Sequence, residues 1–440
     1  MREMKNSGVE WIGEIPVDWD TIKIKQLPDR SIENSFVDGD WIESPDISNE
    51  GIRYLTTGNI GDGKYKKQGN GFVTLEVFQN LNCKYAYPSD LVISRLNAPY
   101  GRSCILPDDY SEYVLAVDNV ILRTNNDKKY ICYITQCDGY QKSVEDNAKG
   151  TTMKRISRTN LGNVLLPFPP LSEQHRIADF LDEKCAKIDA VIEKQKQVIE
   201  KLKEYKLSII TEAVTKGLDP TVPMKDSGVE WIGEIPKGWK VTKLSRVCKT
   251  SSGSTPARNK DNEYFLDDAK IRWVRTLDLN DGLVYDSSEK ISNVALLNSS
   301  CSIMPKDTVC VAMYGGSGTI GKCGILQKEC ATNQAICSIV CDNKIINPYY
   351  MFYQMISSRK YWMKFAVGTR KDPNISQEIV ANAIVVAPSL NIQSEIIGYL
   401  NNKCSVIDSA IVKKQSIVEK LTEYKKSLIY EVVTGKREVL

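Results

Sequence analysis

Two stretches of this chain are copies of one another: LSEQHRIADFLDEKCAKIDAVIEKQKQVIEKLKEYKLSIITEAVT, Leu171–Thr215, and LNIQSEIIGYLNNKCSVIDSAIVKKQSIVEKLTEYKKSLIYEVVT, Leu390–Thr434. They are identical at 21 of 45 positions. In both, apolar residues recur at spacings of three, four and seven, which is typical of a helix that buries one face. The stretches therefore predict two long helices, each roughly 65 Å long at about 1.5 Å per residue.

We expect the two helices to pair through these apolar stripes. Ser172 or Asn391 is the expected N-cap, and Gly217 and Gly435 are expected at the ends. A buried Asp without a partner is costly, so Asp in place of both Leu202 and Leu421 is expected to abolish pairing. The predicted pairing residues are Leu181, Ile188, Leu202, Ile209, Leu400, Ile407, Leu421 and Leu428, and Val191, Val198, Tyr205, Ala410, Ile417 and Tyr424 extend the stripes.

A second, shorter repeat shows that the whole chain is a duplication. MKNSGVEWIGEIP at Met4–Pro16 returns as MKDSGVEWIGEIP at Met224–Pro236, with 12 of 13 positions identical. The repeats predict four segments: a domain at 1–170, a helix at 171–217, a second domain at 218–389 and a second helix at 390–440.

Between the repeats the two halves differ much more, and their composition indicates strands. Short runs rich in Val, Ile, Tyr and Thr alternate with Gly, Pro, Asn and Asp, as in IRYLTTGNIGDGKY (52–65) and IRWVRTLDLNDGLVY (271–285). One helix is expected to close each domain, at about 128–146 and 348–366. The predicted fold class is α+β: two mixed, mainly β domains separated by two long antiparallel coiled-coil helices, with an internal pseudo-two-fold repeat. Such an arrangement suits a two-part site on duplex DNA, and unlike domains predict unlike half-sites.

Composition argues against several classes of site. The 13 cysteines include no C-x-x-C pair and the chain has one histidine, His175, so neither a zinc site nor a disulfide framework is expected. The thiols are expected to be buried in a reducing compartment. Without a signal segment or a long apolar run, the protein is predicted to be cytoplasmic. The net charge of +3 does not by itself indicate nucleic acid, so any phosphate contacts must come from local clusters.

Two motifs approach catalytic signatures without completing them. GGSGTIGKC (315–323) has Cys323 where a P-loop needs Ser or Thr, and strand-like residues follow it, so we expect a strand–loop–strand hairpin. NAPY (97–100) resembles the N-P-P-Y element of DNA adenine methyltransferases but has Ala98 in place of the first proline. A DNA-modifying enzyme is therefore disfavoured, while a coiled-coil scaffold with protein-binding β domains remains an alternative.

Positive indications of DNA contact lie at corresponding places in the two halves. The basic segments KGTTMKRISR (149–158) and GTRKDPNIS (368–376) each precede a long helix. We expect Lys154, Arg155, Arg370 and Lys371 to contact phosphate, so that Ala at any of them lowers the salt slope of binding by about one. Arg, Asn and Ser can also read base edges. The further candidates are Arg53, Lys64, Lys66, Lys67, Arg95, Asn97, Arg102, Arg158, Arg272, Arg275, Tyr314, Ser317 and Lys322.

Three segments resemble the specificity subunits of Type I restriction-modification complexes: SGVEWIGEIP with its following Trp, PPLSEQHRIADFLDEK and EKLKEYKLSIITEAVTKG. This resemblance implies a non-catalytic, sequence-specific DNA-binding subunit whose two variable segments are target recognition domains, one for each half of an asymmetric bipartite target. It implies assembly with two methyltransferase subunits, docked through the helices, and two restriction/translocase subunits. S-adenosylmethionine, ATP and magnesium would then belong to the partners, and this chain would bind no cofactor.

Overall fold

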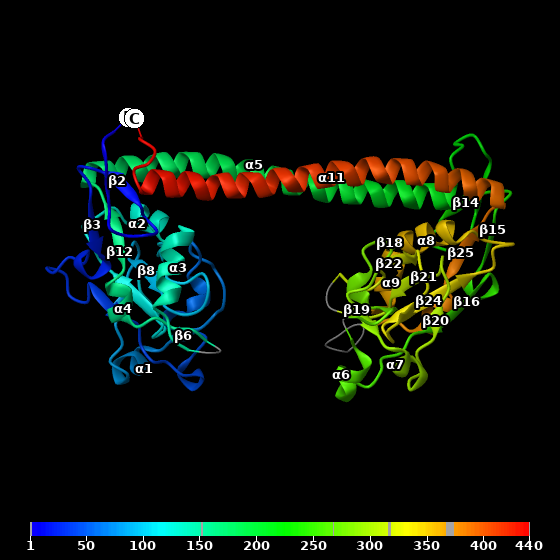
Figure 1. Ribbon diagram of the computed structural model, residues 1–440, viewed down its shortest axis with the longest axis horizontal. Coiled ribbons are helices and arrows are strands. Elements are labelled where there is room, and N and C mark those ends of the chain that lie inside the picture. The colour runs from blue at the N-terminus through cyan, green and yellow to red at the C-terminus, as the bar shows by residue number, and fades with distance from the viewer. Residues whose placement is uncertain (1, 151–152, 267, 316–317, 367–373, 440) are drawn as a thin grey trace. The chain divides into compact units, whose positions relative to one another are not determined.

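The structure, a computed structural model, describes residues 2–150, 153–266, 268–315, 318–366 and 374–439. It divides into a first unit, Met1–Lys196 with Ser416–Leu440, and a second unit, Gln197–Gln415. Helices α5 (Leu171–Lys216, 46 residues) and α11 (Leu390–Val433, 44 residues) each contribute to both units, which confirms the two long helices (Figure 1). None of the helices in the described ranges is long and apolar enough to span a membrane.

The first unit is mixed and mainly β, as predicted. Its two four-stranded sheets have the orders β6-β5-β10-β7 and β4-β11-β8-β9, and β1-β2 and β12-β3 form two-stranded pairs. The strands are β1 (Met4–Asn6), β2 (Glu14–Pro16), β3 (Asp20–Lys23), β4 (Phe36–Asp38), β5 (Ile52–Leu55), β6 (Phe72–Val73), β7 (Tyr85–Ala86), β8 (Leu91–Ser94), β9 (Ser103–Ile105), β10 (Tyr113–Leu115), β11 (Asn119–Leu122) and β12 (Leu165–Phe168). The helices before α5 are η1 (Ile24–Gln26), η2 (Ser44–Asp46), η3 (Thr57–Asn59), α1 (Leu75–Asn80), α2 (Lys128–Ile134), α3 (Asp138–Asp146) and α4 (Arg158–Gly162).

The second unit has the corresponding sheets, with the orders β16-β24-β21-β22-β18 and β19-β17-β23-β20, and the pairs β13-β14 and β15-β25. Its strands are β13 (Met224–Asp226), β14 (Glu234–Pro236), β15 (Lys240–Lys243), β16 (Cys248–Ser252), β17 (Ile271–Val274), β18 (Gly282–Val284), β19 (Glu289–Ile291), β20 (Ile303–Met304), β21 (Val309–Ala312), β22 (Cys323–Leu326), β23 (Cys330–Thr332), β24 (Ile336–Cys341) and β25 (Ile384–Ala387). Its helices between α5 and α11 are η4 (Leu244–Arg246), η5 (Arg258–Lys260), α6 (Asp261–Tyr264), η6 (Thr276–Asp278), α7 (Asn293–Leu297), α8 (Pro348–Ser357), α9 (Arg359–Ala366) and α10 (Gln377–Ala381).

The internal repeat is visible in the strand pairing. In each unit a strand after the MKxSGVEWIGEIP segment pairs antiparallel with the last strand before a long helix, β3 with β12 and β15 with β25. A parallel pair recurs as β5–β10 and β17–β23. The hairpin β8–β9 corresponds to β21–β22, which confirms the strand–loop–strand prediction for the glycine-rich segment.

A repeated glutamine fastens each domain to the start of its long helix. Gln174 is buried, accepts a hydrogen bond from the backbone N–H of Asp127 and donates to the carbonyl of Pro169. Gln393 does the same with Asn347 and Pro388. A buried amide needs a donor for its oxygen and an acceptor for its N–H group, and few other side chains can make both hydrogen bonds. This explains why glutamine occupies the position in both repeats.

Within each unit the long helices pack antiparallel, as predicted. Near the start of α5, Leu181 shares an apolar cluster with Leu428, near the end of α11, and Ile188 packs against it. The Lys425 ammonium lies 2.7 Å from the Asp189 carboxylate. The second unit has the reciprocal arrangement: Ile209, Leu400 and Ile407 are buried in one cluster with Leu202 beside it, and Lys206 pairs with Asp408 at 2.7 Å.

The predicted stripes are only partly buried. Leu421 is half-buried and belongs to none of the apolar clusters of the described residues, and Val191, Val198, Tyr205, Ile417 and Tyr424 are exposed. Ile199 and Ile411 are buried in their place. A straight helix turns by about 20° per heptad relative to a strict seven-residue repeat, so the buried face moves to the neighbouring residue.

Two local predictions were wrong. The helices begin two residues earlier than expected, because the N–H of Gln174 donates to the carbonyl of Pro170 and that of Gln393 donates to the carbonyl of Ser389. Neither Ser172 nor Asn391 is therefore the N-cap. Each domain is closed by two short helices, α2 with α3 and α8 with α9, where one was expected. At both breaks a hydroxyl, that of Thr135 or Ser358, donates to a backbone carbonyl of the preceding turn, which competes with continued helix.

Candidate nucleic-acid interface

In the first unit the structure joins two stretches that the sequence marked separately. The loop of the β8–β9 hairpin meets the basic segment 149–158 through an isolated β-bridge between Leu96 and Arg155. The N–H of Asn97 donates to the carbonyl of Lys154 at 3.3 Å, and the N–H of Ile156 donates to the carbonyl of Arg95 at 3.1 Å. Hairpin loop and pre-helix segment therefore form one surface.

The second unit has the same backbone arrangement. The loop of the β21–β22 hairpin meets the segment before α10 through a bridge between Tyr314 and Asn374, and the N–H of Ile375 donates to the carbonyl of Met313 at 2.8 Å. Of the predicted DNA-contacting residues in this region, Ser317, Arg370 and Lys371 lie outside the described residues.

Three predicted DNA-contacting arginines are buried and occupied within the first unit. Arg53 donates to the carbonyls of Gln68, Gly69 and Gly71. Arg95 donates to the carbonyls of Val117 and Ile156 and lies 3.1 Å from a carboxylate oxygen of Asp38. Arg102 donates to five carbonyls at 2.6 to 3.2 Å, those of Thr57, Ile60, Leu96, Asn97 and Pro99.

Burial lowers the pKa of both Arg95 and Arg102, yet each guanidinium is surrounded by acceptors that suit its charged form. These arginines hold the loops in shape from inside, and with Arg53 they are at most 8% exposed, so their guanidinium groups are not presented to DNA. We therefore remove Arg53, Arg95 and Arg102 from the predicted set of DNA-contacting residues.

Replacing Arg102 with Ala is expected to lower the free energy of unfolding by about 2–4 kcal/mol, because buried carbonyls lose their donor. Lys66→Ala is the control in the same loop region, since Lys66 is exposed and its side chain forms neither hydrogen bond nor ion pair with any described residue. Its effect should stay within about 0.5 kcal/mol. Urea unfolding of both variants measures the difference, and equal midpoints would show that Arg102 does not support the hairpin.

Most of the remaining cations are ion-paired inside their own unit. Such pairing keeps the local charge low, in agreement with the small net charge, and it orients the cations. Lys66 and Lys322 are exceptions, because their side chains make no hydrogen bond or ion pair within the described part of the chain. Of the two described uncharged candidates, the side chain of Asn97 likewise has no hydrogen-bond partner among the described residues, and Tyr314 is partly buried and packs against the second unit's core. The pairs are Lys64–Asp189, Lys67–Asp109, Lys154–Glu145, Arg155–Asp118, Arg158–Asp38, Arg272–Asp286 and Arg275–Glu289.

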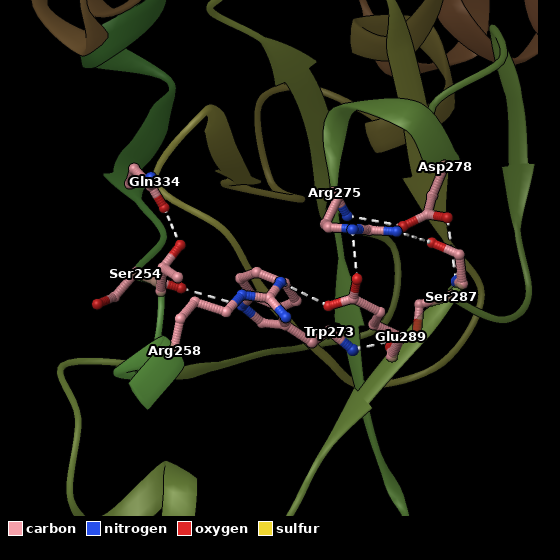
Figure 2. A network of polar contacts seen from close by, with 10 residues as sticks. Ser254, Arg258, Trp273, Arg275, Asp278, Ser287, Glu289 and Gln334 are labelled. Atoms are coloured by element: carbon pink, nitrogen blue, oxygen red, sulfur yellow. Dashed lines mark hydrogen bonds and ion pairs between the residues drawn. The ribbon is translucent and has the colours of Figure 1, made fainter. Parts of the chain in front are cut away.

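Arg275 sits in a polar network that the sequence did not reveal (Figure 2). Its guanidinium donates to Glu289 and, at 2.9 Å, to Ser288, while Glu289 also accepts from Arg258 at 2.7 Å. Asp278 accepts from the backbone N–H of Arg275 at 2.8 Å. The network joins the η6 turn to β19 and η5. Its side-chain pairs are separated by 13 to 31 positions along the chain, so no spacing pattern could have identified them.

Comparison with known proteins agrees with this architecture. The family model described as the Type I restriction modification DNA specificity domain matches residues 16–201 and 236–426. The Type I restriction enzyme MjaIX specificity subunit of Methanocaldococcus jannaschii is 24% identical, over 97% of this chain and 95% of its own length. The Type I restriction enzyme EcoBI specificity subunit of Escherichia coli is 24% identical, over 80% and 74% of the two chains.

One solved structure shows the same fold at low sequence identity. A chain from work on complex assembly and conformational transition of the type I R-M system aligns with a TM-score of 0.71 at 12% identity, covering 96% of this chain and 99% of that chain. The two matched regions of the family model coincide with the two halves of the internal repeat. The chain belongs to the family of Type I restriction-modification specificity subunits.

Proposed function

We propose that this chain is the sequence-specific DNA-binding subunit of a Type I restriction-modification complex and reads an asymmetric bipartite target, one half-site per domain. The observation that carries the proposal is the framework present in both units, a hairpin loop bridged to the segment before the long helix. The same backbone presents different side chains in the two units. Two unlike half-sites require this combination: a shared backbone that positions the loops, and different side chains that contact the bases.

Methyl transfer and cleavage belong to partner subunits in this proposal. Two methyltransferase subunits dock through the long helices, and two restriction/translocase subunits complete the assembly. S-adenosylmethionine, ATP and magnesium act in those partners. The exposed apolar residues of the helices, such as Val191, Val412 and Tyr424, offer them a surface.

Exposed and half-exposed cations near the framework are the candidates for phosphate contact. Lys66 and Lys154 in the first unit and Lys322 in the second are the described candidates, and Arg370 and Lys371 continue as proposals from the sequence. Because each phosphate neutralised by a cation releases counterions, binding should weaken steeply with salt.

A gel-shift titration of the full chain with its methyltransferase subunits on random-sequence duplex tests the proposal. We expect binding at low salt, with the logarithm of the association constant falling linearly with the logarithm of the salt concentration. If no duplex is bound at low salt, the alternative of a coiled-coil scaffold with protein-binding domains gains support.

The long helices are expected to set the number of unread base pairs between the half-sites. Inserting one heptad into both α5 and α11, at the exposed positions around Val191 and Ile417, keeps the apolar faces in phase. We expect an assembled complex whose target has a longer spacer and unchanged half-sites, as read from the methylated motif. An active complex with the original spacer would show that the helices do not set this distance.

A further inference from the structure

Arg155 differs from the other surface cations in how it is held. Its Nε lies 2.5 Å from Oδ1 of Asp118, and both contacting atoms are buried. The side chain as a whole is 41% exposed. Its two terminal amino groups form no hydrogen bond with the described residues, and the side chain pairs with no described carboxylate other than Asp118. The guanidinium is thus anchored at its inner nitrogen and open at its outer edge.

Asp118 is itself fixed by the hairpin framework. It lies between β10 and β11, and its carbonyl accepts a hydrogen bond of 2.8 Å from the N–H of Arg95. The carbonyl of Arg95 in turn accepts a hydrogen bond from the N–H of Ile156, next to Arg155. A short chain of backbone bonds therefore holds the carboxylate beneath the residue that it anchors.

An anchored, charge-compensated arginine is poorly suited to phosphate. Arg155 and Asp118 together are close to neutral, and a phosphate placed against them would meet the carboxylate as well as the guanidinium. A base edge, in contrast, is uncharged and suits a donor held in one orientation. Guanine presents two uncharged acceptors, N7 and O6, to the major groove and is matched by two parallel donors in a fixed orientation.

The second unit places different chemistry on the same frame. The N–H of Met313 donates to the carbonyl of Ala335 at 2.7 Å, as that of Arg95 does to Asp118. Ala335 therefore occupies the position of Asp118, and Asn374, bridged to Tyr314, occupies that of Arg155. Asn374 is exposed, and its neutral amide needs no carboxylate to compensate it.

We propose that Arg155, oriented by Asp118, is a specificity-determining residue that reads a guanine edge in the first half-site. Asp118 is its positioning residue. The inference rests on the proposed function, because it assigns one base contact within the DNA interface. It also separates Arg155 from its neighbour Lys154, whose ammonium lies 3.0 Å from Glu145. Both side chains of that pair are partly exposed, at 43% and 33%, so the flexible lysine stem can turn its ammonium to phosphate instead.

Selection of bound duplexes from a library randomised at all target positions tests this assignment, with the full chain bound to its methyltransferase subunits. For the unaltered protein we expect one guanine in the first half-site to be strongly preferred. Arg155→Ala and Arg155→Lys should each lower that preference roughly ten- to a hundred-fold, because the bidentate contact is lost. The second half-site should be unchanged.

The same selection is carried out with two further variants, Asp118→Asn and Lys154→Ala. Asp118→Asn leaves Arg155 charged but unanchored, so the guanine preference should fall while the salt slope becomes steeper by about one. Lys154→Ala should weaken all sequences alike and leave every base preference intact. Matching thermal unfolding of the variants excludes misfolding as the cause.

Failure of this inference and failure of the proposed function give different results. If Arg155→Ala keeps every base preference and lowers the salt slope by about one, Arg155 contacts phosphate and the inference is wrong. If the unaltered complex shows no base preference at any position, the proposed function itself fails, and this inference with it.

Discussion

Replacing Leu181 with Asp is expected to unfold the first unit. Leu181 is fully buried in the cluster that joins the start of α5 to Leu428 near the end of α11. Loss of a buried leucine side chain costs about 2–5 kcal/mol, and an unpaired buried carboxylate adds several more. The sum approaches the whole stability of a typical domain, about 5–15 kcal/mol.

Val191→Asp is the matched control, because Val191 lies on the same helix but is 42% exposed. It should change the free energy of unfolding by no more than about 0.5 kcal/mol. Urea unfolding followed by circular dichroism compares the two variants. Equal transition midpoints would show that the α5–α11 contact near Leu181 does not hold the unit together. Leu202 and Leu421 are only half-buried, so Asp at either should cost less than the sequence suggested.

Exchanging the first recognition domain is expected to replace one half of the target and leave the other intact. Strand β3 pairs with β12, so an exchange of residues 24–164 retains this pair and both long helices from the present chain. A domain from another family member, grafted between these strands, should bring its own half-site.

Sequencing of methylated DNA reads the outcome of this exchange. We expect a hybrid motif with a new first half, the original second half and the original spacer. A change in both halves would show that the two domains do not read DNA independently.

The long helices were predictable because their signal is periodic and repeated. A 3.6-residue pattern sustained over two copies indicates a helix whatever its surroundings, and the copies identify their own boundaries. Besides the position of the N-caps, the error lay in which residues form the buried face. A strict seven-residue repeat selected Val198, whereas the burial of Ile199 depends on how the neighbouring elements approach.

The candidate residues for DNA contact were less predictable, because residue type alone does not separate a surface arginine from a structural one. Arg102 lies in a loop with a basic, turn-rich sequence, yet the surrounding carbonyls come from residues up to 45 positions away. The pairing of Arg155 with Asp118 likewise depends on a strand–turn–strand path that brings the two together. The partners in such contacts occur at no regular spacing in the sequence, so neither periodicity nor motifs can predict them.

Sequencing of methylated bases in the genome of cells that contain this chain with its methyltransferase subunits, compared with cells that lack the chain, shows whether its two domains read the two halves of one target. We predict methylation at one motif made of two unlike half-sites separated by several unspecified base pairs, absent when the chain is absent. A motif that is contiguous or that persists without this chain would show that its two domains do not read the two halves of the target.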